Sequence, residues 1–259
     1  MTNVCYLLIG LCFTLAINSY AQDLGDRDVL FQTSTIDALL EGVYDGDVTF
    51  KELGKHGDLG IGTFNGLDGE MIGLDGEFYQ IRIDGKAYPV SIDTKTPFAV
   101  VTFFDFDELV TLGKIDSFKE LEERLNSVLP NKNVFYAIKI DGVFDYIKTR
   151  SVPRQNKPYL PLAEVVKEQT IFEFNNVAGT IVGFFCPAYV KGVNVAGYHL
   201  HFITADKSAG GHLLDCRMRN RVAMIDETSR FFMVLPEGAD FAEVDLTRDR
   251  EEELRQIEK

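Results

Sequence analysis

Cysteine and histidine are both scarce in this sequence, with four of each in 259 residues. Cys5 and Cys12 lie in the first 21 residues, so the rest of the chain keeps only Cys186 and Cys216. Two cysteines cannot form the disulfide framework of a small secreted domain. They could pair in an oxidising compartment or remain as two buried thiols. The sequence also has no Asn-x-Ser/Thr sequon, so nothing in it favours a glycosylated protein.

Charged side chains are absent from residues 1–21, which are apolar from Val4 to Ile17 and end in Ser19-Tyr20-Ala21. This pattern predicts a secretory signal peptide cleaved near Ala21, although it lacks the usual Lys or Arg. A membrane anchor is the alternative, but the apolar core is shorter than the roughly 20 residues of a spanning helix. We therefore expect an exported protein, periplasmic or extracellular, that leaves the membrane after cleavage.

Basic residues are outnumbered by acidic ones, 26 to 40, which gives a formal net charge of −14. Nucleic acids and anionic membranes bind clusters of Lys and Arg, so we expect neither as the main partner. The acidic surface mainly favours solubility. The remaining residues 22–259 are enough for one large or two small domains.

Short runs rich in Val, Ile, Phe and Tyr dominate the chain, each bounded by Gly, Pro, Asn or Asp, and this pattern predicts β-strands. Predicted helices are few. In the clearest, 117–129, Ser117 and Glu120 form a capping box and Pro130 follows the end. Three other helices are predicted at 36–41, 162–168 and 248–257. The predicted strands are 88–93, 98–104, 134–140, 170–174, 179–185 and 231–235.

Three prolines within residues 151–161 interrupt the strand pattern and mark a candidate domain boundary. We predict an α+β fold with two β-rich halves, a mixed sheet plus a smaller barrel-like sheet, and few helices. The N-terminal β-rich domain covers residues 22–160. The C-terminal domain, which carries the metal-binding residues discussed next, covers residues 161–259.

Three of the four histidines, His199, His201 and His212, lie within fourteen residues. Side chains alternate between the two faces of a strand, so His199 and His201 share a face. The polar, glycine-rich stretch 204–211 could turn the chain back and open a partner strand at His212. Three converging imidazoles that leave one position open are the ligand set of catalytic zinc, and iron, manganese or nickel also accept nitrogen ligands. We therefore predict a metal site.

The remaining candidates for chemistry are weaker. His56 lies in a glycine-rich stretch, where a hydrogen-bonding structural role is the default. Cys216 shares the alternation of His212, but a sulfur ligand would tend to close the site, so packing is the better interpretation. The sequence GLDGE occurs twice, at 66–70 and 73–77. Two successive Asp-Gly turns explain the repeat structurally, but not the carboxylate that follows each turn.

Several motifs together are similar to one family, the α-acetolactate decarboxylases. They are HGDLGIGTFNGLDGEMI at 56–72, DGEFY at 75–79, TRSVPRQ at 149–155, and GVNVAGYHLHF at 192–202 followed by Gly211-His212. The resemblance covers nearly all of residues 22–259 in the same order. The His-x-His pair alone would not be specific.

The resemblance implies a homodimeric zinc enzyme that converts 2-acetolactate, a 2-hydroxy-3-oxo acid, to (R)-acetoin and carbon dioxide in acetoin and butanediol metabolism. It implies that the zinc ligands are His199, His201 and His212. It places active-site residues at Glu70, Arg150 and Glu258. The duplicated motif also offers Glu77 in place of Glu70, and the acidic tail offers alternatives to Glu258 at residues 251–253.

The chemistry of acetolactate needs these groups. Loss of carbon dioxide leaves an electron pair that must move onto the ketone oxygen, giving an enediolate that a Lewis-acidic metal would stabilise. A guanidinium, here Arg150, is suited to orienting the departing carboxylate. A carboxylic acid with a raised pKa, Glu70 or Glu258, could then protonate one face of the enediolate.

Other functions fit the histidines alone. A cupin-like metal oxygenase or isomerase also carries His-x-His on a strand, but usually adds a carboxylate shortly after, where this chain has Thr204 and Ala205. A zinc hydrolase would use metal-bound water as its nucleophile. An exported, non-catalytic metal-binding protein would need only the ligands.

Overall fold

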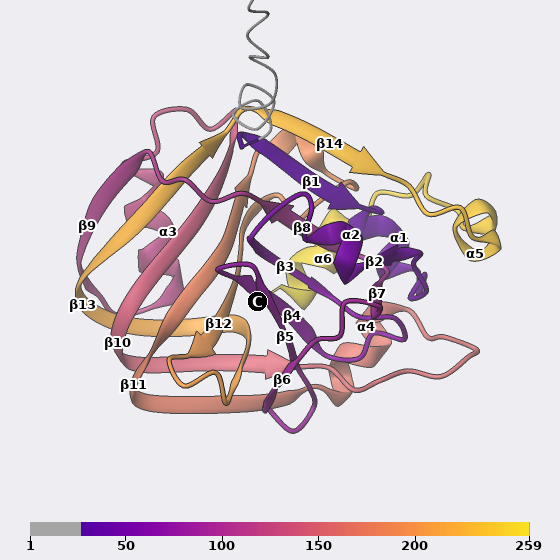
Figure 1. The fold of residues 1–259 in the computed structure, drawn as a ribbon, viewed down its shortest axis with the longest axis horizontal. Helices are drawn as coiled ribbons and strands as arrows, with labels where there is room; N and C mark the ends of the chain where they lie inside the picture. Colours follow the sequence, from indigo (N-terminus) through magenta and orange to yellow (C-terminus); the bar gives the residue numbers. More distant parts are fainter. Residues whose placement is uncertain (1–26, 259) are drawn as a thin grey trace, which may run out of the picture.

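The structure is a computed structural model that describes residues 27–258, and two β-sheets form its frame (Figure 1). The larger sheet has seven strands in the order β14-β1-β8-β3-β4-β5-β6. Only β1 and β14 run parallel among these described strands, so the sheet is mixed, as predicted. Its strands are β1 (Val29–Thr33), β3 (Leu59–Thr63), β4 (Glu70–Leu74), β5 (Glu77–Ile81), β6 (Ala87–Pro89), β8 (Ala99–Thr102) and β14 (Arg230–Val234).

The smaller sheet curls into a ring, which confirms the predicted barrel-like sheet. Its five strands follow the order β10-β11-β12-β13-β9, and β10 also pairs with β13, so four strands close on themselves. These long strands curve around the left side of Figure 1. They are β9 (Glu108–Ile115), β10 (Phe135–Ser151), β11 (Thr170–Cys186), β12 (Gly197–Thr204) and β13 (Gly210–Thr228); β2 (Val48–Thr49) and β7 (Lys95–Thr96) form a separate pair.

The described helices are short. The predicted capping residue Ser117 accepts a hydrogen bond from the backbone N–H of Glu120, but the helix ends at Asn126, earlier than predicted. The Glu120 carboxylate accepts from Asp116 N–H rather than from Ser117, so the predicted capping box is incomplete. The helices are α1 (Ile36–Leu40), α2 (Phe50–Leu53), α3 (Phe118–Asn126), α4 (Leu162–Val165), α5 (Ala239–Glu243) and α6 (Glu251–Ile257), with 3₁₀ turns η1 (Val166–Glu168) and η2 (Ala188–Val190).

Several strand predictions were wrong in their bounds: β8 is shorter than the predicted 98–104, and β10 extends eleven residues beyond the end of the predicted 134–140. The predicted strands 170–174 and 179–185 are one strand, β11, because its pairing with β10 continues through Ala178 and Gly179. Of the predicted strand 88–93, only Tyr88 and Pro89 lie in β6, which is an edge strand that ends at Pro89. Apolar residues bounded by turn formers do not reveal whether neighbouring strands continue to pair.

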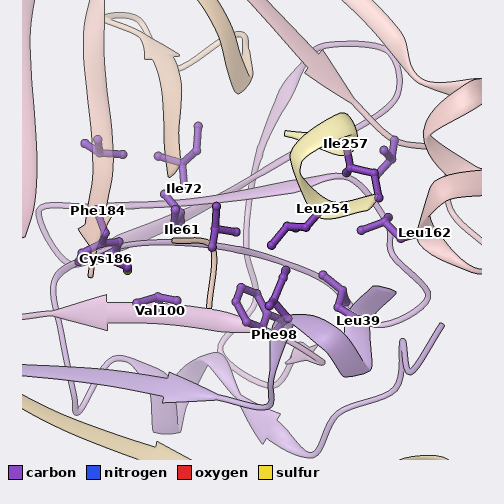
Figure 2. Packing of buried hydrophobic residues seen from close by; sticks show 14 of the residues in the cluster. Leu39, Ile61, Ile72, Phe98, Val100, Leu162, Phe184, Cys186, Leu254 and Ile257 are labelled. Atoms are coloured by element: carbon purple, nitrogen blue, oxygen red, sulfur yellow. The ribbon is translucent and has the colours of Figure 1, made fainter. Parts of the chain in front are cut away.

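Two apolar cores lie on either side of the ring wall. One core joins the seven-stranded sheet to the ring and to α1, α4 and α6; Figure 2 shows Leu254 and Ile257 of α6 packed near Leu39, Phe98 and Leu162. The other fills the ring and includes the buried face of α3. The first core therefore fixes the C-terminal helix against both sheets.

The proposed boundary at residues 151–161 stays a prediction; each sheet takes strands from both sides of it. Cys186 and Cys216 are free, buried thiols in different cores, so the alternative of a disulfide between them is not realised. The predicted signal peptide lies outside the described residues. Among residues 27–258, no helix combines the length and apolar character needed to cross a membrane.

Candidate active site

The β12–β13 hairpin brings the three clustered histidines together, as their spacing predicts. His199 and His201 project from one face of β12, and His201 pairs across the hairpin with His212. His199 Nε2 lies 3.2 Å from His201 Nε2 and 3.2 Å from His212 Nδ1. One candidate ligand atom from each ring lies within 4.8 Å of the other two.

Burial keeps these imidazoles neutral. Desolvation, helped by the nearby charge of Arg150, lowers the pKa of His199 to about 3. Desolvation also holds the pKa of His201 and of His212 well below the ordinary value. His201 donates from Nδ1 to the carbonyl oxygen of Met71 at 2.8 Å, which fixes its tautomer and leaves the Nε2 lone pair free.

The donor set fits a tetrahedral metal ion. Two nitrogen ligands with bonds of about 2.0–2.1 Å to such an ion lie roughly 3.3 Å apart, close to the separations of 3.2 Å seen here. Three neutral imidazoles leave a fourth position for substrate, which is the arrangement of catalytic rather than structural zinc. The same nitrogen ligands also accept iron, manganese or nickel.

Glycine at position 211 lets Arg150 approach this cluster. Arg150, near the end of β10, pairs with His212 of β13. Gly211 has a φ of +143°, and a Cβ there would lie 2.4 Å from the carbonyl oxygen of Arg150. Any side chain at Gly211 would therefore force the two strands apart next to the metal ligands.

Two glutamates flank the buried guanidinium of Arg150. Glu70, the first residue of β4, accepts a hydrogen bond from Arg150 Nη1 at 3.0 Å. Glu258, directly after α6, has Oε1 at 3.9 Å from Arg150 Nη2. The glutamates also face the histidines: Glu70 Oε2 lies 3.8 Å from His201 Nε2, and Glu258 Oε2 lies 3.6 Å from His212 Nε2.

Both glutamates hold their protons more tightly than an exposed carboxyl group. Burial raises the pKa of Glu70 to about 7, partly opposed by the charge of Arg150. Burial raises the pKa of Glu258 to about 7 against the same opposing charge. Near neutral pH each carboxyl group can therefore give or take a proton.

A small cavity adjoins these groups, although His201 is not among the residues that line it. Its polar side is lined by Thr63, Glu70, Arg150, His199, His212 and Glu258. An apolar wall faces them, made by Ile36, Leu39, Leu67, Phe98, Val152 and Leu162. Glu70, Arg150, His199 and His212 are buried, and low exposure to water strengthens electrostatic interactions between such groups.

The structure separates the residues that the sequence left ambiguous. Glu77 is exposed on β5 and accepts a hydrogen bond from the hydroxyl of Tyr79, whereas Glu70 lines the cavity. The tail carboxylates at 251, 252 and 253 form ion pairs with Lys191, Arg255 and Arg250, respectively.

His56 and Cys216 lie outside the site, as expected. His56 stacks on Phe31 with ring centroids 3.9 Å apart. Cys216 packs in the core of the ring.

Sequence reasoning missed two kinds of contributor to the site. The carbonyl of Met71 orients His201, but a backbone acceptor leaves no trace in residue type. The apolar cavity wall comes from α1, α4 and the loops that hold Leu67, Phe98 and Val152, and its residues resemble any other core residues. Only the tertiary structure shows that they line the same cavity as the histidines.

Comparison with known proteins places the chain in a family. The family model for alpha-acetolactate decarboxylase matches residues 30–248. The chain is 57% identical over 232 residues to alpha-acetolactate decarboxylase of Methanosarcina mazei, covering 90% of this chain and 81% of the relative. It is 48% identical to that of Bacillus subtilis, covering 84% and 85%. The crystal structure of alpha-acetolactate decarboxylase from Bacillus subtilis superposes with a TM-score of 0.86 at 45% identity, covering 89% of this chain and 98% of that one.

The raised pKa values of the glutamates predict how metal affinity depends on pH. As pH rises from 6 to 8, Glu70 and Glu258 lose protons and gain negative charge beside the ligands, while the histidines stay neutral throughout. The association constant for Zn²⁺, measured by competition with a chelator, should rise about tenfold. This is the change in an equilibrium constant that one pKa unit represents. A Glu70→Gln, Glu258→Gln double variant should show a nearly flat profile. An undiminished slope in that variant would mean that the histidines themselves titrate in this range.

Proposed function

This chain belongs to the alpha-acetolactate decarboxylase family, a family of carboxy-lyases, and we propose that it converts 2-acetolactate to (R)-acetoin and carbon dioxide with a bound zinc ion. The observation that carries the proposal is the convergence of three neutral imidazoles, one buried guanidinium and two buried carboxyl groups at one site, where all of these groups except His201 line a single cavity. This set matches the chemical demands of the reaction.

The three histidines would hold the metal. When bound, a divalent ion would act as a Lewis acid toward the ketone and hydroxyl oxygens of the substrate and would stabilise the negative charge that develops during decarboxylation. The imidazoles contribute by being neutral before the metal binds, because no proton then has to be displaced.

Arg150 would bind and orient the substrate carboxylate. Its guanidinium is held by Glu70, and its Nε has no hydrogen-bond partner among the described residues. When the bond to the carboxylate breaks, the electron pair moves toward the ketone oxygen and the carboxylate carbon leaves as carbon dioxide. Because Arg150 also interacts with two carboxyl groups of the protein, it binds the substrate carboxylate less tightly in the ground state. Weaker binding of the ground state favours the loss of carbon dioxide.

Glu70 and Glu258 would supply a proton and a hydrogen-bond acceptor to the substrate. One carboxyl group delivers a proton to the carbon that lost carbon dioxide, on one face only, which yields a single enantiomer. The other can accept a hydrogen bond from the substrate hydroxyl. Their pKa values, both raised by burial to about 7, suit either role.

The proposed reaction has a direct test. Purified protein comprising residues 22–259 should form (R)-acetoin from racemic acetolactate, as measured by chiral gas chromatography. Removal of metal by a chelator should abolish the activity, and zinc should restore it. His199→Ala should lose bound metal and activity together, whereas His56→Ala, which changes a histidine outside the cluster, should keep both. Acetoin formation by fully metal-free protein would contradict the proposed zinc dependence.

Replacing Glu70 separates proton transfer from metal binding. Glu70→Gln should keep stoichiometric metal, because the carboxylate is no nearer than 3.8 Å to a ligand nitrogen of His201. Its kcat should fall about 10²- to 10⁴-fold, the range for losing a general acid or base. The matched control is Glu77→Gln in the duplicated motif, which should change kcat less than about twofold because Glu77 is exposed. A normal rate for Glu70→Gln would refute its role.

Two further proposals concern the state of the protein in the cell. A homodimer is supported by Phe231 and Phe232, which are exposed on β14 at the edge of the larger sheet. Light scattering after gel filtration would measure the mass. Export is supported only by the sequence of residues 1–21, and the N-terminus of protein recovered outside the cytoplasm would show whether cleavage occurs near Ala21.

A further inference from the structure

Glu258 owes its place in the cavity to a short helix. It is the C-cap of α6, and its N–H donates to the carbonyl of Leu254 at 3.0 Å. α6 has seven residues, and its N-cap, Arg250, makes no side-chain capping hydrogen bond. A helix of this length is not stable alone in water. The position of Glu258 therefore depends on what holds α6 against the rest of the protein.

Apolar contacts are only part of what keeps α6 packed against the rest of the protein. Leu254 and Ile257 are buried against Leu39, Phe98 and Leu162, as Figure 2 shows. Hydrophobic contact is strong but non-directional, so it tolerates small rotations or shifts of a helix. A carboxylate that must stay about 4 Å from both Arg150 and His212 needs a directional constraint as well.

Arg150 Nη2 donates to the carbonyl oxygen of Ile257 at 3.5 Å near the C-terminal end of α6, and Arg250 supplies a directional constraint at the N-terminal end. Its side chain is only 12% exposed and forms an ion pair with Glu41, the C-cap of α1. Its Nη1 also lies 2.7 Å from Glu253 in the first turn of α6. Burial raises the pKa of Asp37 of α1, and the charge of Arg250 also acts on this carboxyl group by opposing that rise. One guanidinium thus joins α6 to α1.

The other ion pairs of α6 are poor candidates for this role. Lys191 pairs with Glu251, and Arg255 pairs with Glu251 and Glu252, but Lys191 and Arg255 are 54% and 50% exposed. Exposed pairs contribute little because water and salt screen them. Compared with these exposed pairs, the pair between Arg250 and Glu41 is largely shielded from water, with side chains 12% and 19% exposed.

The helix on the other side of this ion pair is itself part of the cavity. Ile36 and Leu39 of α1 line the wall opposite Arg150. The Arg250 ion pair therefore sets the distance between the apolar wall and the carboxylate that faces it. Arg250 is not among the residues that line this cavity.

We propose that Arg250, through its ion pair with Glu41, is a positioning residue that holds Glu258 in register with Arg150 and the metal ligands. The proposal rests on the function proposed above, because Glu258 has a task only if the substrate is bound in this cavity. Arg250 acts on the reaction only through Glu258.

Steady-state kinetics test this assignment. Arg250→Ala should lower kcat roughly 10- to 100-fold, the cost of a small misplacement of a reacting group, with little change in KM and full metal content. Arg250→Lys should recover part of the loss, because it keeps the charge but not the forked geometry. Arg255→Ala is the matched control on the same helix and should remain within about twofold of wild type.

The decisive comparison uses Glu258→Gln as the background. If Arg250 acts through Glu258, adding Arg250→Ala to Glu258→Gln should lower kcat less than about twofold further. An equal loss in both backgrounds would overturn the proposal, since it would mean that Arg250 serves some other part of the protein. An unchanged kcat for Arg250→Ala in the wild-type background would also overturn it.

Hydrogen exchange gives a readout that does not need the reaction. Arg250→Ala should speed amide exchange in residues 251–258 about tenfold and leave the ring strands unchanged, whereas Arg255→Ala should not. Unchanged exchange in Arg250→Ala would overturn the proposal. Wild-type protein that fails to decarboxylate acetolactate would refute the proposed function instead, and the exchange measurement would still show whether Arg250 fixes α6.

Discussion

The buried guanidinium of Arg150 is the constraint around which the rest of the site is arranged. It is 5% exposed, and a charge at that depth is tolerated only with opposite charge beside it. Glu70 arrives from β4 in the seven-stranded sheet, and Glu258 arrives from α6. Neither comes from the ring that carries Arg150 and the histidines. Satisfying one charge therefore requires both sheets and the C-terminal helix to come together.

Charge balance explains why two carboxyl groups surround one guanidinium. With a divalent metal, Arg150, one ionised glutamate and one protonated glutamate that can donate its proton, the cavity would carry a net charge of about +2. Binding the acetolactate anion would lower that charge to about +1, so the negative charge of the substrate favours its entry into a buried site. Before metal binds, burial raises both glutamate pKa values to about 7, which limits the negative charge held in the cavity.

The sequence predicted the convergence of the histidines on the β12–β13 hairpin well, because the alternation of side chains along a strand is a local rule. Alternation along β12 places His199 and His201 on one face, and the short glycine-containing turn determines that His212 lies opposite. Glu70 and Glu77 follow identical local sequences, so no local rule separates them. Their difference comes from pairing: Glu70 is held between Thr63 of β3 and Ile81 of β5, whereas Glu77 begins β5 at an exposed turn. Similarly, the closure of the ring by β10 and β13 joins residues about 60 positions or more apart, beyond the reach of periodicity.

The position of α6 could not be predicted, for a related physical reason. The charged sequence 248–257 is typical of a solvated helix. Only two of the seven residues of α6, Leu254 and Ile257, are buried. What brings Glu258 inward is the docking of Leu254 and Ile257 on a core shared by both sheets, together with a guanidinium at the N-cap. The three histidines thus lie on strands that pair with their neighbours in the ring, while Glu258 is held by a few tertiary contacts. Elements held by few contacts open at lower free energy than sheet strands, so the geometry of the three histidines is more robust than the position of Glu258.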